Sequence, residues 1–132
     1  SDLLEQIGID LLHVSFGIPF DRKIKVPEDF PYNSIVYTGT QVKKHIQIPV
    51  IVVNDIRTLN RGNILIENGV CDFVAFGRPF LADKEFLTKS LDNYDFNPCL
   101  GCKNCQWFRN GERCPARIKT ELLLRHTKRM EE

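Results

Sequence analysis

"IPVIVVNDIRTLNRGNILIENGVCDFVAFGRPFLAD" (residues 48–83) contains two short apolar runs, 49–53 and 72–76, separated by a stretch with helical character at 58–68. The first run, Pro-Val-Ile-Val-Val, has no polar alternation, which is typical of a parallel strand with helices over both faces of its sheet. Gly69 follows the helical stretch, at a position where glycine commonly ends a helix. The order strand, helix, strand therefore predicts parallel β-strands joined by a helix.

The residues before this stretch extend the same pattern. A third apolar run at 10–15 predicts another strand, and helices are expected at 3–7 and at about 39–46. Parallel strands in the resulting αβαβαβ order all end at one edge of the sheet, where functional residues gather. Residues 18–34 contain three prolines and no clear period, so we expect a long excursion over that edge.

After the last strand, we expect a short helix at about 83–91, a cysteine-rich segment, and a final helix at 116–132. The final helix combines one apolar stripe with many charges, which is typical of a solvated helix. The sequence thus predicts an α/β region over 1–92 and a cysteine-rich region with a terminal helix over 93–132.

Composition narrows the class of protein. The 132 residues are 42% hydrophobic and 27% charged, as in an ordinary globular domain, and the net charge is +1. A charge so close to zero argues against nucleic acid or an anionic membrane surface as the main partner. No apolar run approaches the length of about 18 residues that a membrane span requires. We therefore expect a cytoplasmic protein.

Residues 76–83, "FGRPFLAD", directly follow the last predicted strand. Gly77 lets another group approach the backbone closely, amides at a helix start can face an anion, and Arg78 adds a permanent charge with paired donors. These residues predict an anion site. A tight turn with a surface arginine is the alternative.

Residues 99–114, "CLGCKNCQWFRNGERC", hold four of the five cysteines in the chain. In a reducing cytoplasm, clustered cysteines are more often metal ligands than disulfides, and redox-active thiols are the next alternative. We therefore interpret this segment first as a metal site.

Residues 48–83 closely resemble the last two βα units of the old yellow enzyme-like family, the NADH:flavin oxidoreductases with an FMN-binding (β/α)8 barrel. Loops after the last two strands hold the FMN phosphate in that family, in agreement with the general phosphate site of such barrels. The resemblance implies that Asn54 with its adjoining backbone, Gly77 and Arg78 bind the FMN phosphate. Many family members have glycine at the position of Asn54.

The resemblance extends to Cys99, Cys102, Cys105 and Cys114. One branch of the family, resembling 2,4-dienoyl-CoA reductase and trimethylamine dehydrogenase, binds a [4Fe–4S] cluster just after the last barrel unit. The C-x2-C-x2-C-x8-C spacing lets three close thiols wrap one face of a cubane while the fourth closes it. Four thiolates also suit tetrahedral zinc, and free thiols without metal are the third possibility.

The resemblance implies that the chain is the C-terminal part of a barrel. A whole (β/α)8 barrel needs about 250 residues, and only about three βα units are expected here. In the intact enzyme, hydride would pass from NAD(P)H to FMN and then to a small-molecule acceptor such as an activated alkene. No catalytic residue is assigned in this chain, so we expect it to be inactive alone. Its open sheet edges and apolar inner face predict self-association.

Two rival interpretations are kept. Dihydroorotate dehydrogenase-like flavin barrels also hold a phosphate after their last strands. Alternatively, the chain is a small zinc-stabilised α/β module that binds a protein partner and has no catalytic role. The identity of the metal separates this module from a flavin enzyme, because iron with sulfide implies electron transfer.

Several other residues have two explanations each. Asp83 lies where a helix is expected to begin, so capping is a better explanation than general-base catalysis. Arg57 and Arg61 either assist the phosphate or belong to a solvated helix face. Trp107 and Phe108 either line a path between flavin and cluster or pack the cysteine loop onto the barrel. We favour the packing role.

Overall fold

The computed structural model describes residues 2–16, 24–119 and 122. It divides the chain into two compact units, which are described separately: unit 1 (Ser1–Ile56 and Asn60–Phe76) and unit 2 (Arg57–Leu59 and Gly77–Glu132). The predicted boundary after residue 92 falls inside unit 2. The functional division into an FMN-binding region and a cysteine-rich region remains a prediction.

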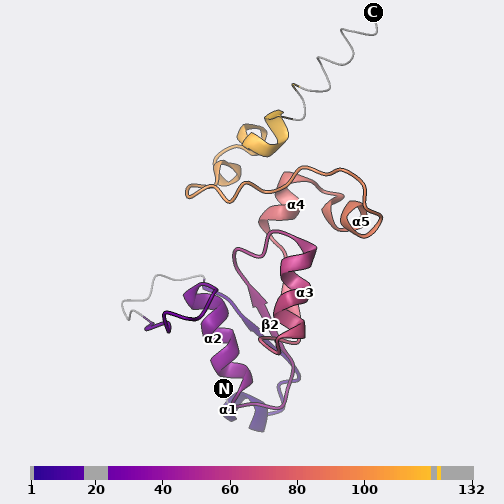
Figure 1. The fold of residues 1–132 in the computed structure, drawn as a ribbon. Coiled ribbons are helices and arrows are strands. Elements are labelled where there is room, and N and C mark those ends of the chain that lie inside the picture. Colours follow the sequence, from indigo (N-terminus) through magenta and orange to yellow (C-terminus); the bar gives the residue numbers. More distant parts are fainter. Residues whose placement is uncertain (1, 17–23, 120–121, 123–132) are drawn as a thin grey trace, which may run out of the picture. The chain divides into compact units, whose positions relative to one another are not determined.

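Unit 1 contains a three-stranded parallel sheet in the order β1 (Leu12–Val14), β2 (Val50–Val53) and β3 (Phe73–Ala75). Figure 1 shows β2 between the helices of this unit. All three strands lie within the apolar runs that predicted them, and their parallel pairing confirms the expected topology. Because the strands run in the same direction, their C-terminal ends meet at one edge of the sheet.

Unit 1 contains the helices α1 (Asp2–Gln6) and α2 (Ser34–Lys43), and all of α3 (Leu59–Glu67) except its first residue. The first and third occur where the sequence predicts helices. The second begins before the predicted range of 39–46, because Asn33 caps it. The Asn33 side-chain oxygen accepts hydrogen bonds from the amides of Ile35 at 3.0 Å and Val36 at 3.1 Å, and such a cap stabilises a helix by about 1 kcal/mol.

Both α2 and α3 pack against the same face of the sheet through glycine residues. Val14, Val52 and Val74 lie side by side in the register on this face. A Cβ atom at Gly39 of α2 would run into Val52 Cγ1, and one at Gly62 of α3 would lie 3.0 Å from Val74 Cγ2. Glycine at these two positions therefore leaves the space that the valine side chains of the sheet occupy.

The opposite face of the sheet presents a row of His13, Ile51 and Phe73. His13 is exposed, Ile51 is half-buried and Phe73 is 52% exposed. Within the described residues, α2 and α3 thus cover one face only, which differs from the prediction of helices over both faces. The uninterrupted run of Val50–Val53 indicates an apolar environment on both sides, but it does not specify that helices form both.

The longer part of unit 2, from Gly77 on, contains α4 (Arg78–Ala82) and α5 (Phe86–Leu91), followed by two short 3-10 helices, η1 (Gln106–Phe108) and η2 (Gly111–Arg113). The sequence predicted α5 but not α4 as a separate helix. Phe86 is fully buried and packs edge-on against Phe80 and Phe96, with ring centroids 5.5 and 5.4 Å away. This aromatic cluster joins the two helices to the chain that leads into the cysteine segment.

The expected terminal helix is described only in part. Residues 115–119 are helical, whereas 120–132, apart from 122, lie outside the described residues. In the part of the chain that the structure describes, no helix has the length and apolar character of a membrane span.

Candidate functional site

The turn that follows β2 has an unusual backbone. Asn54 and Asp55 adopt φ angles of 104° and 53°, in the left-handed region that favours glycine. Such conformations cost about 1–3 kcal/mol for a residue with a side chain, and they persist where surrounding structure holds them. The position of Asn54 therefore has a backbone conformation that glycine adopts more readily than asparagine.

Asn33 helps to hold this turn. Its side-chain nitrogen donates a hydrogen bond to the Asn54 carbonyl oxygen at 3.3 Å, while its oxygen caps α2. One amide side chain thus joins the start of α2 to the end of β2. Sequence inspection missed this role, although an asparagine directly before an apolar helical stretch is the signal for a cap.

Arg61, in the first turn of α3, is also fixed near the start of α2. Its guanidinium carbon lies 5.2 Å from the centroid of the Tyr32 ring, a cation–π contact. The side chain is half-buried, so it does not belong to a fully solvated helix face. Its suggested assistance to a phosphate remains a prediction.

Gly77 and Arg78 follow β3 after one intervening residue, Phe76, and belong to unit 2. Gly77 precedes α4 with φ −106° and ψ −78°, and a Cβ atom there would meet nothing within 4 Å. The backbone at Gly77 is therefore open to an approaching group, as the sequence argument required. Arg78 is the first residue of α4 and is half-buried. The binding roles of Asn54, Gly77 and Arg78 stay predictions.

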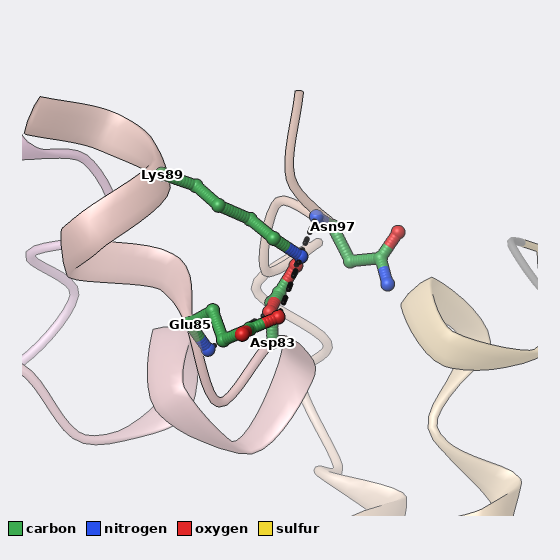
Figure 2. A network of polar contacts seen from close by, with 4 residues as sticks. All are labelled: Asp83, Glu85, Lys89 and Asn97. Carbon is green, nitrogen blue, oxygen red and sulfur yellow. Dashed lines mark hydrogen bonds and ion pairs between the residues drawn. The ribbon is translucent and has the colours of Figure 1, made fainter. Parts of the chain in front are cut away.

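Figure 2 shows Asp83 at the centre of a polar network in unit 2. Its carboxylate accepts hydrogen bonds from the Glu85 amide at 2.9 Å, the Asn97 amide at 3.1 Å and Lys89 Nζ at 2.9 Å. Lys89 also lies 3.4 Å from the Glu85 carboxylate. Asp83 follows the last residue of α4, and α5 begins after Glu85 without a side-chain cap. Asp83 therefore binds the backbone between the two helices and does not cap the start of α5 as predicted.

The environment of Asp83 lowers its pKa. The residue is only 8% exposed, and burial alone raises the pKa of a carboxyl group. The hydrogen bonds from Lys89, Glu85 and Asn97 outweigh that effect, so the pKa of Asp83 lies below its ordinary value. Because Asn97 stands two residues before Cys99, this ionised carboxylate fixes the chain where it enters the cysteine segment.

Cys99, Cys102, Cys105 and Cys114 are all half-buried free thiols. Cys105 directly precedes η1, and Cys114 directly follows η2. Among the described residues, which include these four, no three His, Cys, Asp or Glu side chains are gathered closely enough to hold one metal ion. The structure therefore provides a suitable set of thiol donors on one segment but does not gather them, and their role as ligands stays a prediction.

Trp107 organises the second half of this segment. A Cβ atom at Gly111 would lie 2.6 Å from the Trp107 ring, and the guanidinium carbon of Arg117 lies 5.4 Å from the ring centroid. Trp107 thus packs within the segment, against the loop between Cys105 and Cys114. Phe108, by contrast, is 81% exposed.

The sequence is similar to several known proteins, although no protein-family model matches the chain. The chain is 35% identical over 103 residues to the NADH oxidase of Thermoanaerobacter brockii, covering 76% of this chain and 16% of that protein. It is 36% identical over 109 residues to the bilirubin reductase of Mediterraneibacter gnavus, covering 78% of this chain and 17% of that protein. The chain therefore spans less than a fifth of the length of either relative.

Among solved structures, the chain resembles the X-ray structure of a variant of NCR from Zymomonas mobilis. The TM-score is 0.51 at 18% identity, and the match covers 74% of this chain and 29% of that chain. At this identity the likeness concerns the fold, and it supports the α/β arrangement of parallel strands and helices.

Three observations now agree: the resemblance of residues 48–83, the relatives named for NADH oxidation and bilirubin reduction, and the shared α/β fold. The chain belongs to the old yellow enzyme-like family of NADH:flavin oxidoreductases.

Proposed function

We propose that this chain supplies the FMN phosphate site and a four-cysteine iron–sulfur site to an FMN-dependent NAD(P)H oxidoreductase. The observation that carries the proposal is the order of residues along the two regions. Consecutive parallel strands lead into Asn54 and into Gly77–Arg78, and the cysteine segment then follows. The relatives that match most of this chain are named as an oxidase of NADH and a reductase.

The proposal includes a partial (β/α)8 barrel. In such a barrel the helices form an outer ring, and the inner face of the strands is filled with side chains. The packing of α2 and α3 on one face of the sheet, with His13, Ile51 and Phe73 on the other, supports this arrangement. A doubly wound sheet, with helices on both faces, is less compatible with it.

The FMN phosphate would be held by the turn at Asn54 and by Gly77 and Arg78. Two features of the chain fit such a group: the glycine-like backbone of Asn54, and the open space at Gly77 where a Cβ atom would meet nothing. Arg78 would add charge-assisted hydrogen bonds. Bound FMN supplies hydride-transfer chemistry, and the role of these residues is to bind and orient it.

The iron–sulfur site would use Cys99, Cys102, Cys105 and Cys114. Their chemistry fits, because all four are unpaired thiols with partial access to solvent. A bound [4Fe–4S] cluster supplies one-electron transfer. Because the thiols are not gathered in the described arrangement, the loop would have to close as the cluster binds.

The substrates are inferred from chemistry and relatives together. One relative is named for NADH and another for bilirubin, so we infer NAD(P)H as the hydride source and a small organic molecule with a reducible double bond as the acceptor. We assign no catalytic residue to this chain and propose that it has no reductase activity alone. Measurable NAD(P)H-dependent turnover by the purified chain would contradict that last statement.

The deciding experiment is iron, sulfide and zinc analysis of the chain purified without oxygen. The proposal predicts about four irons and four sulfides per chain with broad visible absorption. Cys102→Ser should lose most of the iron, whereas Cys71→Ala, which changes the cysteine outside the segment, should keep it. Zinc in a one-to-one ratio, without sulfide, would instead favour the zinc-stabilised module and remove the electron-transfer role.

A further inference from the structure

Arg57 lies against the turn that carries the first two cysteines of the segment. A Cβ atom at Gly101 would be 2.9 Å from the guanidinium carbon of Arg57 and 3.3 Å from its Cδ, with Nη1 closer still. The half-buried guanidinium therefore packs directly on the backbone between Cys99 and Cys102. Both partners of this contact belong to unit 2.

The residue at position 101 has two reasons to be glycine. Its φ angle is 66°, in the left-handed region, and a side chain there would displace Arg57. In the sequence Cys-Leu-Gly-Cys, the glycine therefore leaves room for Arg57, which lies more than forty positions earlier in the chain. Spacing alone identified the cysteines but could not identify this partner.

The same turn is also held on its N-terminal side. Asp83 accepts the Asn97 amide at 3.1 Å, two residues before Cys99. Side chains of opposite charge, each from outside the cysteine segment, thus hold the turn at residues 97 and 101. The two contacts are independent of each other, because they use different backbone groups and different side chains.

We propose that Arg57 is a positioning residue of the cysteine site, which fixes the Cys99–Cys102 turn and places a permanent positive charge next to its thiolate ligands. The inference deepens the proposed iron–sulfur function and rests on it for its electrostatic part. A cluster with four thiolate ligands carries net negative charge, which increases on reduction, so a fixed cation nearby raises the reduction potential. The mechanical part of the inference does not require metal.

The mechanical part is tested by hydrogen exchange on the metal-free chain. We expect amides 97–103 in Arg57→Gln to exchange about three- to tenfold faster than in the original chain, as for the loss of a packed charged contact. Arg109→Gln, which changes an exposed arginine of the same segment, should leave them unchanged. Unchanged exchange of 97–103 in Arg57→Gln would overturn the inference whether or not the chain binds iron.

The electrostatic part is tested by redox titration of the chain reconstituted with iron and sulfide. Arg57→Gln should lower the midpoint potential, and Arg57→Lys, which keeps the charge, should restore most of it. If the role of Arg57 were purely structural, its variants would differ in cluster content, but Arg57→Lys and Arg57→Gln would not differ in midpoint potential in this way. Equal midpoint potentials in the original chain and both variants would overturn the electrostatic part. If the original chain failed to take up iron, that result would count against the proposed function, and the hydrogen-exchange result would decide the inference.

A steric test uses two glycines with nearly the same backbone. Gly101 and Gly69 have φ angles of 66° and 65°, but only Gly101 would bring a Cβ atom against Arg57. Gly101→Ala should therefore reproduce the faster exchange of residues 97–103, whereas Gly69→Ala should lower stability through backbone strain alone. Similar exchange at 97–103 in both variants would contradict the contact.

Discussion

At the scale of single residues, Asp83 shows how one carboxylate can fix the course of a loop. It is nearly buried and ionised, and it accepts hydrogen bonds from two backbone amides and one ammonium group. Removing one partner from such a set leaves the others unsatisfied, which costs more than the hydrogen bond itself contributed.

We therefore expect Asp83→Asn to lower the free energy of unfolding by about 2–3 kcal/mol at pH 7. Because the pKa of Asp83 is lowered in the folded protein, this stability is present above the pKa of the unfolded chain, about 3.9, and is lost as pH falls through the folded value. Denaturant titrations at pH 7 and below pH 3 provide the measurement. Asp95→Asn, at an exposed position, is the control, and an Asp83→Asn deficit that persisted at low pH would contradict the electrostatic explanation.

Under the proposed function, Arg78 supplies the positive charge that recognises the FMN phosphate. We expect Arg78→Glu to abolish the preference of the chain for FMN over riboflavin and to weaken FMN binding by about tenfold or more, because a charge-assisted hydrogen bond is worth about 1.5–3 kcal/mol. Fluorescence titration with both flavins measures the effect. Arg109→Glu, with the same charge change at an exposed position, should bind FMN like the original chain, and equal losses in the two variants would show that net charge alone is responsible.

Cys71 differs from the other four cysteines. It is 2% exposed, and burial, with a smaller contribution from Asp72, raises the pKa of its thiol to about 11. Since only the thiolate reacts, Cys71 should resist alkylation at pH 7.5 in the folded chain while the four half-buried thiols of the metal-free segment react. Mass spectrometry before and after denaturation counts the labels. Labelling of Cys71 at the rate of the others in folded protein would contradict its place in the core.

At the scale of helices and strands, the sequence could predict an element when neighbouring residues determine it, but not when contacts between distant residues do. The three strands were predictable because runs such as 49–53 are apolar over their full length. The start of α2 was missed although Asn33 is a local cap signal, since the prolines nearby suggested a longer loop. The bond from Asn33 to the Asn54 carbonyl joins residues 21 positions apart, so no local pattern could reveal it.

The packing of α2 on β2 gives a test at this scale. Gly39→Ala places a methyl group against Val52 Cγ1 in the core, and overpacking of this kind lowers the free energy of unfolding by about 1–3 kcal/mol. Gly77→Ala adds the same methyl group where nothing lies within 4 Å, so stability should hardly change. Thermal or denaturant unfolding compares the two. If Gly77→Ala keeps its stability yet weakens FMN binding, the result would also support close approach of the phosphate.

The candidate site was predictable in its residue types but not in its supporting contacts. Gly77, Arg78 and the four cysteines stand out by chemistry and spacing. Arg57 and Asp83 were also considered, for a phosphate and for a helix cap, but nothing near them in the sequence shows that they contact residues 101 and 97. The same is true of Trp107, whose contact with Gly111 depends on how the loop folds back.

At the scale of the whole molecule, the parallel sheet has two edge strands, β1 and β3, and one face with the row His13, Ile51 and Phe73. Parallel sheets are normally covered on both faces. The chain also spans only 16% of the length of the similar NADH oxidase and 17% of that of the bilirubin reductase. These observations motivate the proposal that further βα units, or a second copy of the chain, cover this face.

We expect the isolated chain to self-associate in a concentration-dependent way. Phe73→Glu should reduce the association constant by at least about tenfold, because it places a charge on the apolar face. Phe108→Glu changes a more exposed phenylalanine outside the sheet, so it should have little effect. Sedimentation velocity over a range of concentrations measures both, and a chain that remains monomeric throughout would contradict the proposal.

The placement of residues 57–59 in unit 2, between parts of the chain that belong to unit 1, has a practical consequence for engineering. The cysteine segment cannot be transferred as one continuous stretch of sequence, because its structural unit also includes residues 57–59. Transplanting residues 93–132 alone onto another barrel would leave behind the arginine that supports Gly101, and the graft would receive its ligands without their support. A working chimera should therefore carry residues 57–59 and 77–119 together, and the recipient should offer a β2–α3 loop of the same length.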